Sequence, residues 1–231
     1  MRNIHFFLDF DGTIATHDIV DLVLERFADK RWKEVEKEWV EGHIGSRECL
    51  TRQIGMVRAT PDQLREAVAG VKLDPHFVSF LKKAEELGVL VTIVSDGFDL
   101  FIEQVLKENL HKARPDLLKG LPIFSNKLQK SGDGFKAVFE SEDGCVHGCA
   151  NCKLAVIKRM TALEDYVFFV GDGLSDRFAA KHAHMTFAKG KLLKYCEENN
   201  IDYIPYKNFK KVEDWLVENY PMLRKMRDGR R

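Results

Sequence analysis

The stretch that decides the fold is Ile4-His5-Phe6-Phe7-Leu8-Asp9-Phe10-Asp11-Gly12-Thr13, near the start of a chain of 231 residues. It opens with a short apolar run that ends in Asp and Gly, a pattern typical of a buried β-strand. Two carboxylates, those of Asp9 and Asp11, follow this strand directly. Burying unpaired carboxylates is costly unless a cation or hydrogen bonds compensate. The end of this strand is therefore predicted to form the floor of an active site.

The chain after this first strand is predicted to be helical as far as Gly70. Apolar residues recur there at three- and four-residue spacing, which predicts amphipathic helices. These segments cover residues 17–28, 32–42, 47–57 and 61–70. We therefore expect a helical cap domain at residues 15–72, inserted into a core domain formed by residues 1–14 and 73–231.

In the remainder of the chain, strand patterns alternate with helix patterns. Strands are predicted at residues 89–96, 166–172, 185–190 and 201–206, with helices between them and at residues 74–88. Two further apolar segments flank Ser131-Gly132-Asp133-Gly134, which predicts a β-hairpin insertion at about residues 121–142. This alternation indicates an α/β fold with a doubly wound parallel sheet.

Composition narrows the class of protein. Lys plus Arg total 36 and Asp plus Glu total 36, so no net field favours nucleic acid or an anionic membrane as a partner. No apolar run approaches the roughly 20 residues of a membrane span. The first apolar run is short and interrupted by Asp9, so no signal peptide is expected. Five cysteines are an odd number and do not suggest a secreted disulfide framework. We expect a cytoplasmic monomer or homodimer that binds a small molecule.

Polar residues end two more of the predicted strands. Ser95 closes the second strand, and Asp172 closes the third, with Asp176 just beyond it. Ligands of open α/β sheets bind outside the carboxyl ends of the strands. Asp9 and Asp11 project to the same side of their strand, so one can attack an electrophile while the other transfers a proton. Asp172 adds a further negative charge to Asp9 and Asp11, and a hard cation would offset the repulsion among these carboxylates. A site with only oxygen ligands suits Mg²⁺.

Ser95 and Lys153 narrow the chemistry further. A hydroxyl and an ammonium group suit a bound phosphoryl group, and an aspartate can carry that group as an acyl phosphate. Each motif alone is also compatible with an ordinary strand-ending turn. Their joint placement favours an active site.

Together these residues resemble the four motifs of the haloacid-dehalogenase superfamily, in the family's order, over residues 4–188. The motifs are Asp9-Phe10-Asp11-Gly12-Thr13, then Ser95, then Lys153, then Gly171-Asp172-Gly173-Leu174-Ser175-Asp176. The resemblance implies that Asp9 is the nucleophile and that Asp11 is the general acid and then the base. It implies a Mg²⁺ site formed by Asp9, the backbone carbonyl of Asp11 and Asp172, supported by Asp176. It also implies a phosphate site formed by Ser95, Asp96, Gly97 and Lys153, and a cap that acts as a lid.

Within the superfamily, the chain resembles the phosphoserine-phosphatase-like branch. The segment Cys145-Val146-His147-Gly148-Cys149-Ala150-Asn151-Cys152-Lys153 is similar to a loop of the 2-hydroxy-3-keto-5-methylthiopentenyl-1-phosphate phosphatases of methionine salvage. Phosphoethanolamine/phosphocholine phosphatases have a related loop. The expected function is a magnesium-dependent phosphomonoesterase acting on a small phosphorylated metabolite. Alternatives are a phosphoserine or phosphoethanolamine/phosphocholine phosphatase, a phosphotransferase, and a non-catalytic binding protein, which the intact motifs argue against.

Four polar residues of the expected cap are predicted to contact the rest of the substrate. They are Asp18, Arg47, Arg52 and Gln53. The resemblance to phosphoserine phosphatases places Gln53 where that family has an arginine, with Arg52 adjacent. It places Asp18 where that family has a glutamate facing the substrate ammonium. Asp18 is equally compatible with the first turn of a helix, where an acidic side chain is favoured.

Three of the five cysteines lie within eight residues. Cys145, Cys149 and Cys152, with His147 between them, offer ligands that suit a structural zinc ion. A disulfide is a second interpretation, which a cytoplasmic location disfavours. Reduced thiols that shape the loop before Lys153 are the interpretation we favour. Cys49 and Cys196 are interpreted as small buried apolar residues.

Overall fold

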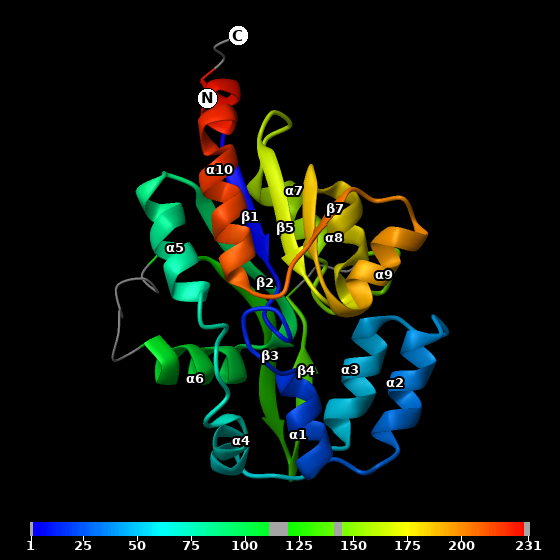
Figure 1. Ribbon diagram of the computed structural model, residues 1–231. Helices are drawn as coiled ribbons and strands as arrows, with labels where there is room; N and C mark the ends of the chain where they lie inside the picture. Colours follow the sequence, from blue (N-terminus) through cyan, green and yellow to red (C-terminus); the bar gives the residue numbers. More distant parts are fainter. Residues whose placement is uncertain (1, 111–119, 141–144, 229–231) are drawn as a thin grey trace.

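The computed structural model describes residues 2–110, 120–140 and 145–228. Its centre is one seven-stranded sheet with the order β4-β3-β2-β1-β5-β6-β7 (Figure 1). The strands are β1 Ile4–Leu8, β2 Leu90–Phe98, β3 Ile123–Ser131, β4 Gly134–Val138, β5 Tyr166–Gly171, β6 Met185–Ala188 and β7 Tyr203–Pro205. Neighbouring strands pair in parallel, except that β4 runs antiparallel to β3. The order grows outward from β1 in both directions, so the predicted doubly wound α/β fold is confirmed.

Helices cover both faces of this sheet. One face carries α5 (Phe77–Glu86) and α10 (Phe209–Arg227), which pack against each other, and the other carries α7 (Lys153–Met160), α8 (Arg177–His182) and α9 (Gly190–Glu198) (Figure 1). Helix α6 (Asp99–Leu110) packs against β3. None of the described helices is long and apolar enough to cross a membrane.

The central strand β1 supplies apolar side chains to both faces. Phe6 stacks on Phe168, with ring centroids 4.8 Å apart, and meets the edge of Phe80. Phe7, one residue later, packs in a separate apolar cluster, together with residues of α7 and α9. Because side chains alternate along a strand, a strand covered on both faces requires a nearly continuous apolar run, which β1 interrupts only at the buried His5. That run ends at Asp9, where the sheet ends.

The four predicted helices of residues 15–72 are present. They are α1 (Ile19–Phe27), α2 (Trp32–Val40), α3 (Ser46–Gly55) and α4 (Pro61–Val68), and they lie beyond the carboxyl ends of the central strands (Figure 1). We refer to residues 15–72 as the helical block. Helix α4 begins with a capping box between Thr60 and Gln63, which satisfies backbone N–H groups that the helix leaves unpaired. The assignment of the block as a separate cap domain stays a prediction.

The predicted β-hairpin is formed by β3 and β4, paired from Lys127–Val138 to Ser131–Gly134. It differs from the expected insertion because the first part of β3 continues the central sheet, pairing Ile123 and Phe124 with Ile93 and Val94 of β2. The sequence predicts the turn and the segment of residues 121–129 before it, but not the pairing of that segment with β2, because pairing between distant strands leaves no local pattern. Residues 141–142 of the predicted insertion lie outside the described residues.

His5 is a buried titratable group in β1. Its Nε2 lies 2.8 Å from Oγ1 of Thr92, and its ring stacks on Phe7. Burial lowers the pKa of His5 from 6.5 to about 4, with Asp165 partly opposing the shift. The unfolded chain therefore binds this proton more readily than the folded chain, and folding is weakened as pH falls below the unfolded pKa.

We predict that His5 alone lowers the free energy of unfolding by about 2 kcal/mol between pH 7 and pH 5. Urea unfolding measures the free energy of unfolding at the two pH values. Its decrease from pH 7 to pH 5 should be about 2 kcal/mol smaller in His5→Val than in the wild type. His43→Gln, at an exposed site, is the control and should keep the wild-type difference. The same pH dependence in His5→Val and wild type would contradict the assignment.

Candidate active site

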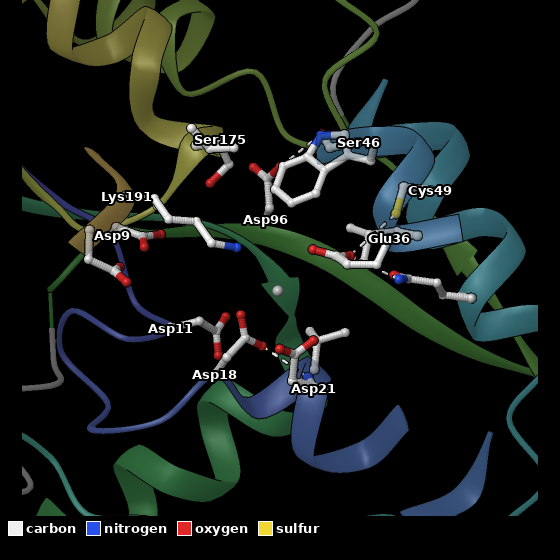
Figure 2. Close-up of a pocket in the computed structure, with 18 of the residues that line it drawn as sticks. Asp9, Asp11, Asp18, Asp21, Glu36, Ser46, Cys49, Asp96, Ser175 and Lys191 are labelled. Carbon is white, nitrogen blue, oxygen red and sulfur yellow. Dashed lines mark hydrogen bonds between the residues drawn. The ribbon is translucent and has the colours of Figure 1, made fainter. Parts of the chain in front are cut away.

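The carboxyl ends of β1, β2 and β5 meet beside the helical block and bring the predicted catalytic residues together. A cavity of about 350 Å³ lies between these strand ends and the block (Figure 2). The sheet side of its lining includes Asp9, Asp11, Asp96, Gly97, Asp172 and Ser175. The helical block closes the opposite side with residues of α1, α2 and α3.

Lys153 is the cation at the floor of this site. Its side chain is buried, and Nζ donates to Oδ1 of Asp9 and to Oδ1 of Asp176, both at 2.5 Å. Burial acts to lower the pKa of Lys153, but Asp176 and Asp9 outweigh it and hold that pKa well above its usual value. Lys153 is therefore charged, and it fixes the position of one oxygen of Asp9.

Three carboxylates gather around this ammonium group. Oxygen atoms of Asp9, Asp172 and Asp176 lie within 4.8 Å of one another. Burial raises the pKa of Asp9 well above its usual value, and repulsion from Asp176 adds to the shift. The same two causes raise the pKa of Asp172 to about 6. Three carboxylates facing one ammonium group carry excess negative charge, and their oxygen-only donor set fits a hard divalent cation such as Mg²⁺.

The three carboxylates are not equally available to a cation. Oδ1 of Asp176 accepts from Lys153, and its Oδ2 accepts from the backbone N–H groups of Asp172 and Gly173. Asp176 is therefore already committed to holding the turn after β5. Asp9 and Asp172 are better placed to bind a cation directly, in keeping with the supporting role predicted for Asp176.

Asp11 has a different environment from Asp9. Its Oδ1 accepts from the backbone N–H of Ile19 at 3.0 Å, and its Oδ2 accepts from Oγ of Ser95 at 3.3 Å. Burial, followed by repulsion from Asp18, raises the pKa of Asp11 to about 8. A carboxyl group with this pKa is largely protonated at neutral pH, which is the state that a general acid needs. A cation ligand at Asp11, predicted through its backbone carbonyl, stays a prediction.

The end of β2 carries the predicted phosphate-binding residues. Its register against β3 shifts between Val94 and Phe98, which frees Ser95, Asp96 and Gly97 from regular pairing. The backbone N–H of Gly97 donates to Oγ of Ser95 at 2.9 Å, beside Asp11. Gly97 lines the cavity, whereas Ser95 and Lys153 are buried outside its lining and contact it through Asp11 and Asp9, respectively. Their role in binding phosphate stays a prediction.

Comparison with known proteins places the chain in a family. The family model of the haloacid dehalogenase-like hydrolases matches residues 6–181. The chain belongs to the haloacid dehalogenase-like hydrolase family.

Individual members of the family agree with this assignment. A 2-hydroxy-3-keto-5-methylthiopentenyl-1-phosphate phosphatase of Bacillus mycoides is 26% identical, over 91% of this chain and 94% of its own length. The corresponding phosphatase of Geobacillus thermodenitrificans is 26% identical, over 93% and 96%. A solved phosphoserine phosphatase, captured as a phospho-aspartyl intermediate analogue, superposes with a TM-score of 0.70 at 20% identity, covering 93% of this chain and 99% of its own. The predicted superfamily and the predicted phosphatase type of enzyme are confirmed.

In this haloacid dehalogenase-like hydrolase, two of the four residues predicted to contact the substrate line the cavity and two do not. Asp18 and Gln53 line the cavity. Arg47 and Arg52 are not part of that lining: Arg52 forms a two-pronged ion pair with Glu38, at 2.6 and 2.9 Å, and the guanidinium of Arg47 lies over the ring of Phe139. The cavity-facing side of α3 carries Ser46, Cys49, Leu50 and Gln53, at the three- and four-residue spacing of one helix face. Both arginines lie off that face.

Asp18 both caps a helix and borders the cavity. Its Oδ1 accepts from the backbone N–H of Asp21 at 3.0 Å, which caps the N-terminus of α1. Its side chain also lines the cavity, beside Asp11 (Figure 2), while its contact with a substrate stays a prediction. Burial, followed by repulsion from Asp21, raises the pKa of Asp18 to about 6.

Other cavity residues were missed from the sequence, four of which are charged or aromatic. Asp21, Glu36 and Trp39 belong to α1 and α2 of the helical block, and Lys191 belongs to α9; Asp21, Glu36 and Lys191 can be followed in Figure 2. Asp21 follows Asp18 at helical spacing, and Trp39 follows Glu36 in the same way, which is a weak signal for a shared face. The sequence of an amphipathic helix does not say whether its polar face borders solvent or a cavity.

The cysteine-rich loop brings three of its four candidate ligands together. The sulfur atoms of Cys145, Cys149 and Cys152 lie within 4.8 Å of one another, and all three are free thiols. His147 instead stacks on Phe178, with ring centroids 3.8 Å apart. Burial acts to raise the pKa of the Cys145 thiol, but hydrogen bonds from the backbone of Cys149 and His147 bring it below its usual value.

This loop also joins the helical block to the sheet. The backbone N–H of Ala150 donates to Oγ of Ser46, whose hydroxyl donates to Oδ2 of Asp96. The backbone N–H of Arg47 donates to the carbonyl of Gly148 at 3.0 Å. The two backbones approach so closely that a Cβ atom at Gly45 would lie 2.4 Å from that same carbonyl oxygen. Only glycine fits at residue 45 without displacing the loop.

We predict that Gly45→Ala lowers the free energy of unfolding by about 1–3 kcal/mol, because the added methyl group forces α3 and the loop apart. The matched control is Gly55→Ala, at the other end of the same helix, where a Cβ atom meets nothing within 4 Å. Alanine there should be neutral or stabilising by about 0.5–1 kcal/mol. Chemical denaturation of both variants measures the difference, and equal stability of the two would contradict the close contact.

Proposed function

We propose that this protein is a magnesium-dependent phosphatase that hydrolyses a small phosphate monoester through a phosphoryl group carried on Asp9. The observation that supports this most directly is the contrast between two neighbouring carboxyl groups. Burial raises the pKa of both groups, but Asp9 forms an ion pair with the charged Lys153, whereas Asp11 accepts from the neutral donors Ile19 and Ser95 and its pKa is raised to about 8. One group is fixed for attack, and the other keeps a proton to give.

The proposed reaction has two steps. A carboxylate oxygen of Asp9 attacks phosphorus, the bond to the ester oxygen breaks, and Asp11 gives its proton to the leaving alcohol. Asp11, now a carboxylate, then takes a proton from water as that water attacks phosphorus, which releases phosphate and restores Asp9. Ser95, the N–H of Gly97 and Lys153 hold the phosphoryl oxygens. Magnesium, bound by Asp9 and Asp172, would reduce the repulsion between the carboxylates and the phosphoryl group.

For the substrate, the first candidate is 2-hydroxy-3-keto-5-methylthiopentenyl-1-phosphate, the compound named for the relatives. The far end of the cavity includes the apolar side chains of Val20, Trp39 and Leu50, which suit an uncharged chain ending in a thioether. We place the reaction in the cytoplasm and the enzyme in a monomeric or homodimeric state, as the sequence led us to expect.

A second candidate is a phosphate ester whose alcohol carries an amine, such as phosphocholine or phosphoethanolamine. The charge of the cavity away from the strand ends favours such an amine. Three carboxylates, those of Asp18, Asp21 and Glu36, line this part, and Lys191 is the one cation among the described lining residues. A cationic leaving group would offset this negative charge. Phosphoserine fits less well, since its carboxylate would face these acids while Arg47 and Arg52 lie outside the lining. Transfer to an alcohol in place of water is the remaining alternative for the second step.

We predict that Asp9→Asn reduces phosphate release by about a thousandfold or more, because an amide oxygen does not form the acyl phosphate. Asp202→Asn, at an exposed site, should keep wild-type activity. Release of phosphate from a generic aryl phosphate, with circular dichroism to check folding, measures both variants. In the wild type, a chelator should stop the reaction and added Mg²⁺ should restore it. Near-normal turnover by folded Asp9→Asn would exclude Asp9 as the nucleophile.

We also predict that the wild type prefers phosphocholine to its uncharged analogue 3,3-dimethylbutyl phosphate by about tenfold or more in kcat/KM. Glu36→Gln should reduce this ratio several-fold, whereas Glu34→Gln, on the exposed face of the same helix, should not. A ratio near one in the wild type would exclude charge recognition at the far end. Including the methylthiopentenyl compound in the same assay decides between the two candidate substrates, since the native substrate should have the highest kcat/KM.

A further inference from the structure

A second cluster of reactive side chains lies outside the catalytic cavity, in the loop of residues 145–152. We propose that Cys145, Cys149 and Cys152 bind a zinc ion that fastens this loop to the start of α7. The three sulfur atoms do not belong to the lining of the catalytic cavity. Cys145 and Cys152 instead line a separate surface hollow on the outer side of α7.

The distances between the thiols suit a metal ion better than a disulfide. All three sulfur atoms lie within 4.8 Å of one another. Zinc binds thiolates at about 2.3 Å in a tetrahedron, which places sulfur atoms about 3.8 Å apart, so shifts of about 1 Å would complete the site. A disulfide would use two of the thiols at an S–S distance of about 2 Å and leave the third unused. Three thiols directed at one point are the donor set that zinc prefers.

All three thiols come from one short segment of the chain. The backbone N–H of Gly148 donates to the carbonyl of Cys145 at 3.0 Å, which closes a turn and brings Cys149 back beside Cys145. Cys152 is the N-cap residue of α7, where the helix dipole favours a thiolate. The ligands therefore come from one compact segment of eight residues.

The surroundings of the thiols balance the charge of such a site. Zinc with three thiolates carries one net negative charge, and Lys158 and Arg159 of α7 line the hollow beside the thiols. His147 lines the same hollow but stacks on Phe178, so the fourth position is open to water, or to the imidazole if its ring leaves Phe178. The amine of Lys153 lies in the catalytic cluster instead, bound to Asp9 and Asp176.

The consequence for the enzyme follows from the neighbours of the loop. Lys153 is the residue after Cys152, and Ser46 and Arg47 of α3 hold the loop through Ala150 and Gly148. A zinc ion would thus fix both the position of the catalytic ammonium group and the junction with the helical block. Zinc acts here as a structural ion and takes no part in the phosphoryl transfer.

The test is metal binding by the reduced, full-length protein. After removal of metal and titration with Zn²⁺, the wild type should bind one zinc ion that survives dialysis. Co²⁺ in its place should give thiolate-to-cobalt charge-transfer absorption and the visible bands of a tetrahedral site. The Asp172→Asn variant should retain both signals, which separates this site from the carboxylate cluster.

The cysteine variants complete the test. Cys145→Ser, Cys149→Ser and Cys152→Ser should each lose the bound zinc and the charge-transfer band, while Cys196→Ala, a buried cysteine in the core, should keep both. A change in the visible cobalt bands of His147→Ala assigns the fourth ligand to His147, and an unchanged spectrum assigns it to water. The proposal is overturned if the reduced wild type neither retains zinc nor shows the charge-transfer band. It is also overturned if the folded serine variants bind zinc as the wild type does.

Discussion

The rest of the site depends on one buried ammonium group. Removing a lysine side chain from water is costly, and only close carboxylates repay that cost. Lys153 has two of them, and they come from separate parts of the chain: Asp9 from the end of β1, and Asp176 from the short 3₁₀-helix η2 (Leu174–Asp176). The charge balance that positions Asp9 therefore also joins the ends of β1 and β5 to the start of α7. Loss of any of the three groups leaves an uncompensated charge in the interior.

The cavity has two electrostatic environments. At the strand ends, the negative charge of Asp9, Asp172 and Asp176 is partly met by Lys153 and leaves room for a divalent cation. At the far end, Asp18, Asp21 and Glu36 lie beside Trp39 and Lys191. The first environment suits chemistry shared by the whole family, because it is built from its four motifs. The second is formed by the helical block together with Lys191 of α9 and lies outside the four motifs.

Much of this architecture could be predicted from the sequence because it rests on local signals. The apolar run before Asp9, the turn residues after each strand and the helical spacing of residues 17–70 each report on their immediate neighbourhood. The proximity of the predicted catalytic residues could be predicted because parallel strands end at the same edge of a sheet. The orientation of α3 could not be predicted, because it depends on packing between helices. The sequence therefore placed Arg52 as well as Gln53 in the cavity, and only Gln53 lines it. Glu36 and Trp39 of α2 and Lys191 of α9 were missed because their places in the cavity also depend on long-range packing. The pairing of β3 with β2, by which the hairpin extends the sheet, is long-range as well.

The two chain segments that connect the helical block to the sheet lie side by side. An isolated β-bridge joins Ala15 to Leu73, the backbone N–H of Thr16 donates to the carbonyl of Lys72, and that of Asp74 donates to the carbonyl of Ile14. These hydrogen bonds hold the two segments in a fixed register where the chain enters and leaves the block. The segment that enters the block leads directly into α1, whose first residue, Ile19, donates its backbone N–H to Asp11. The position of α1 and the hydrogen bonding of the Asp11 carboxyl group are therefore linked, and a displacement of this helix would change the proton affinity of Asp11.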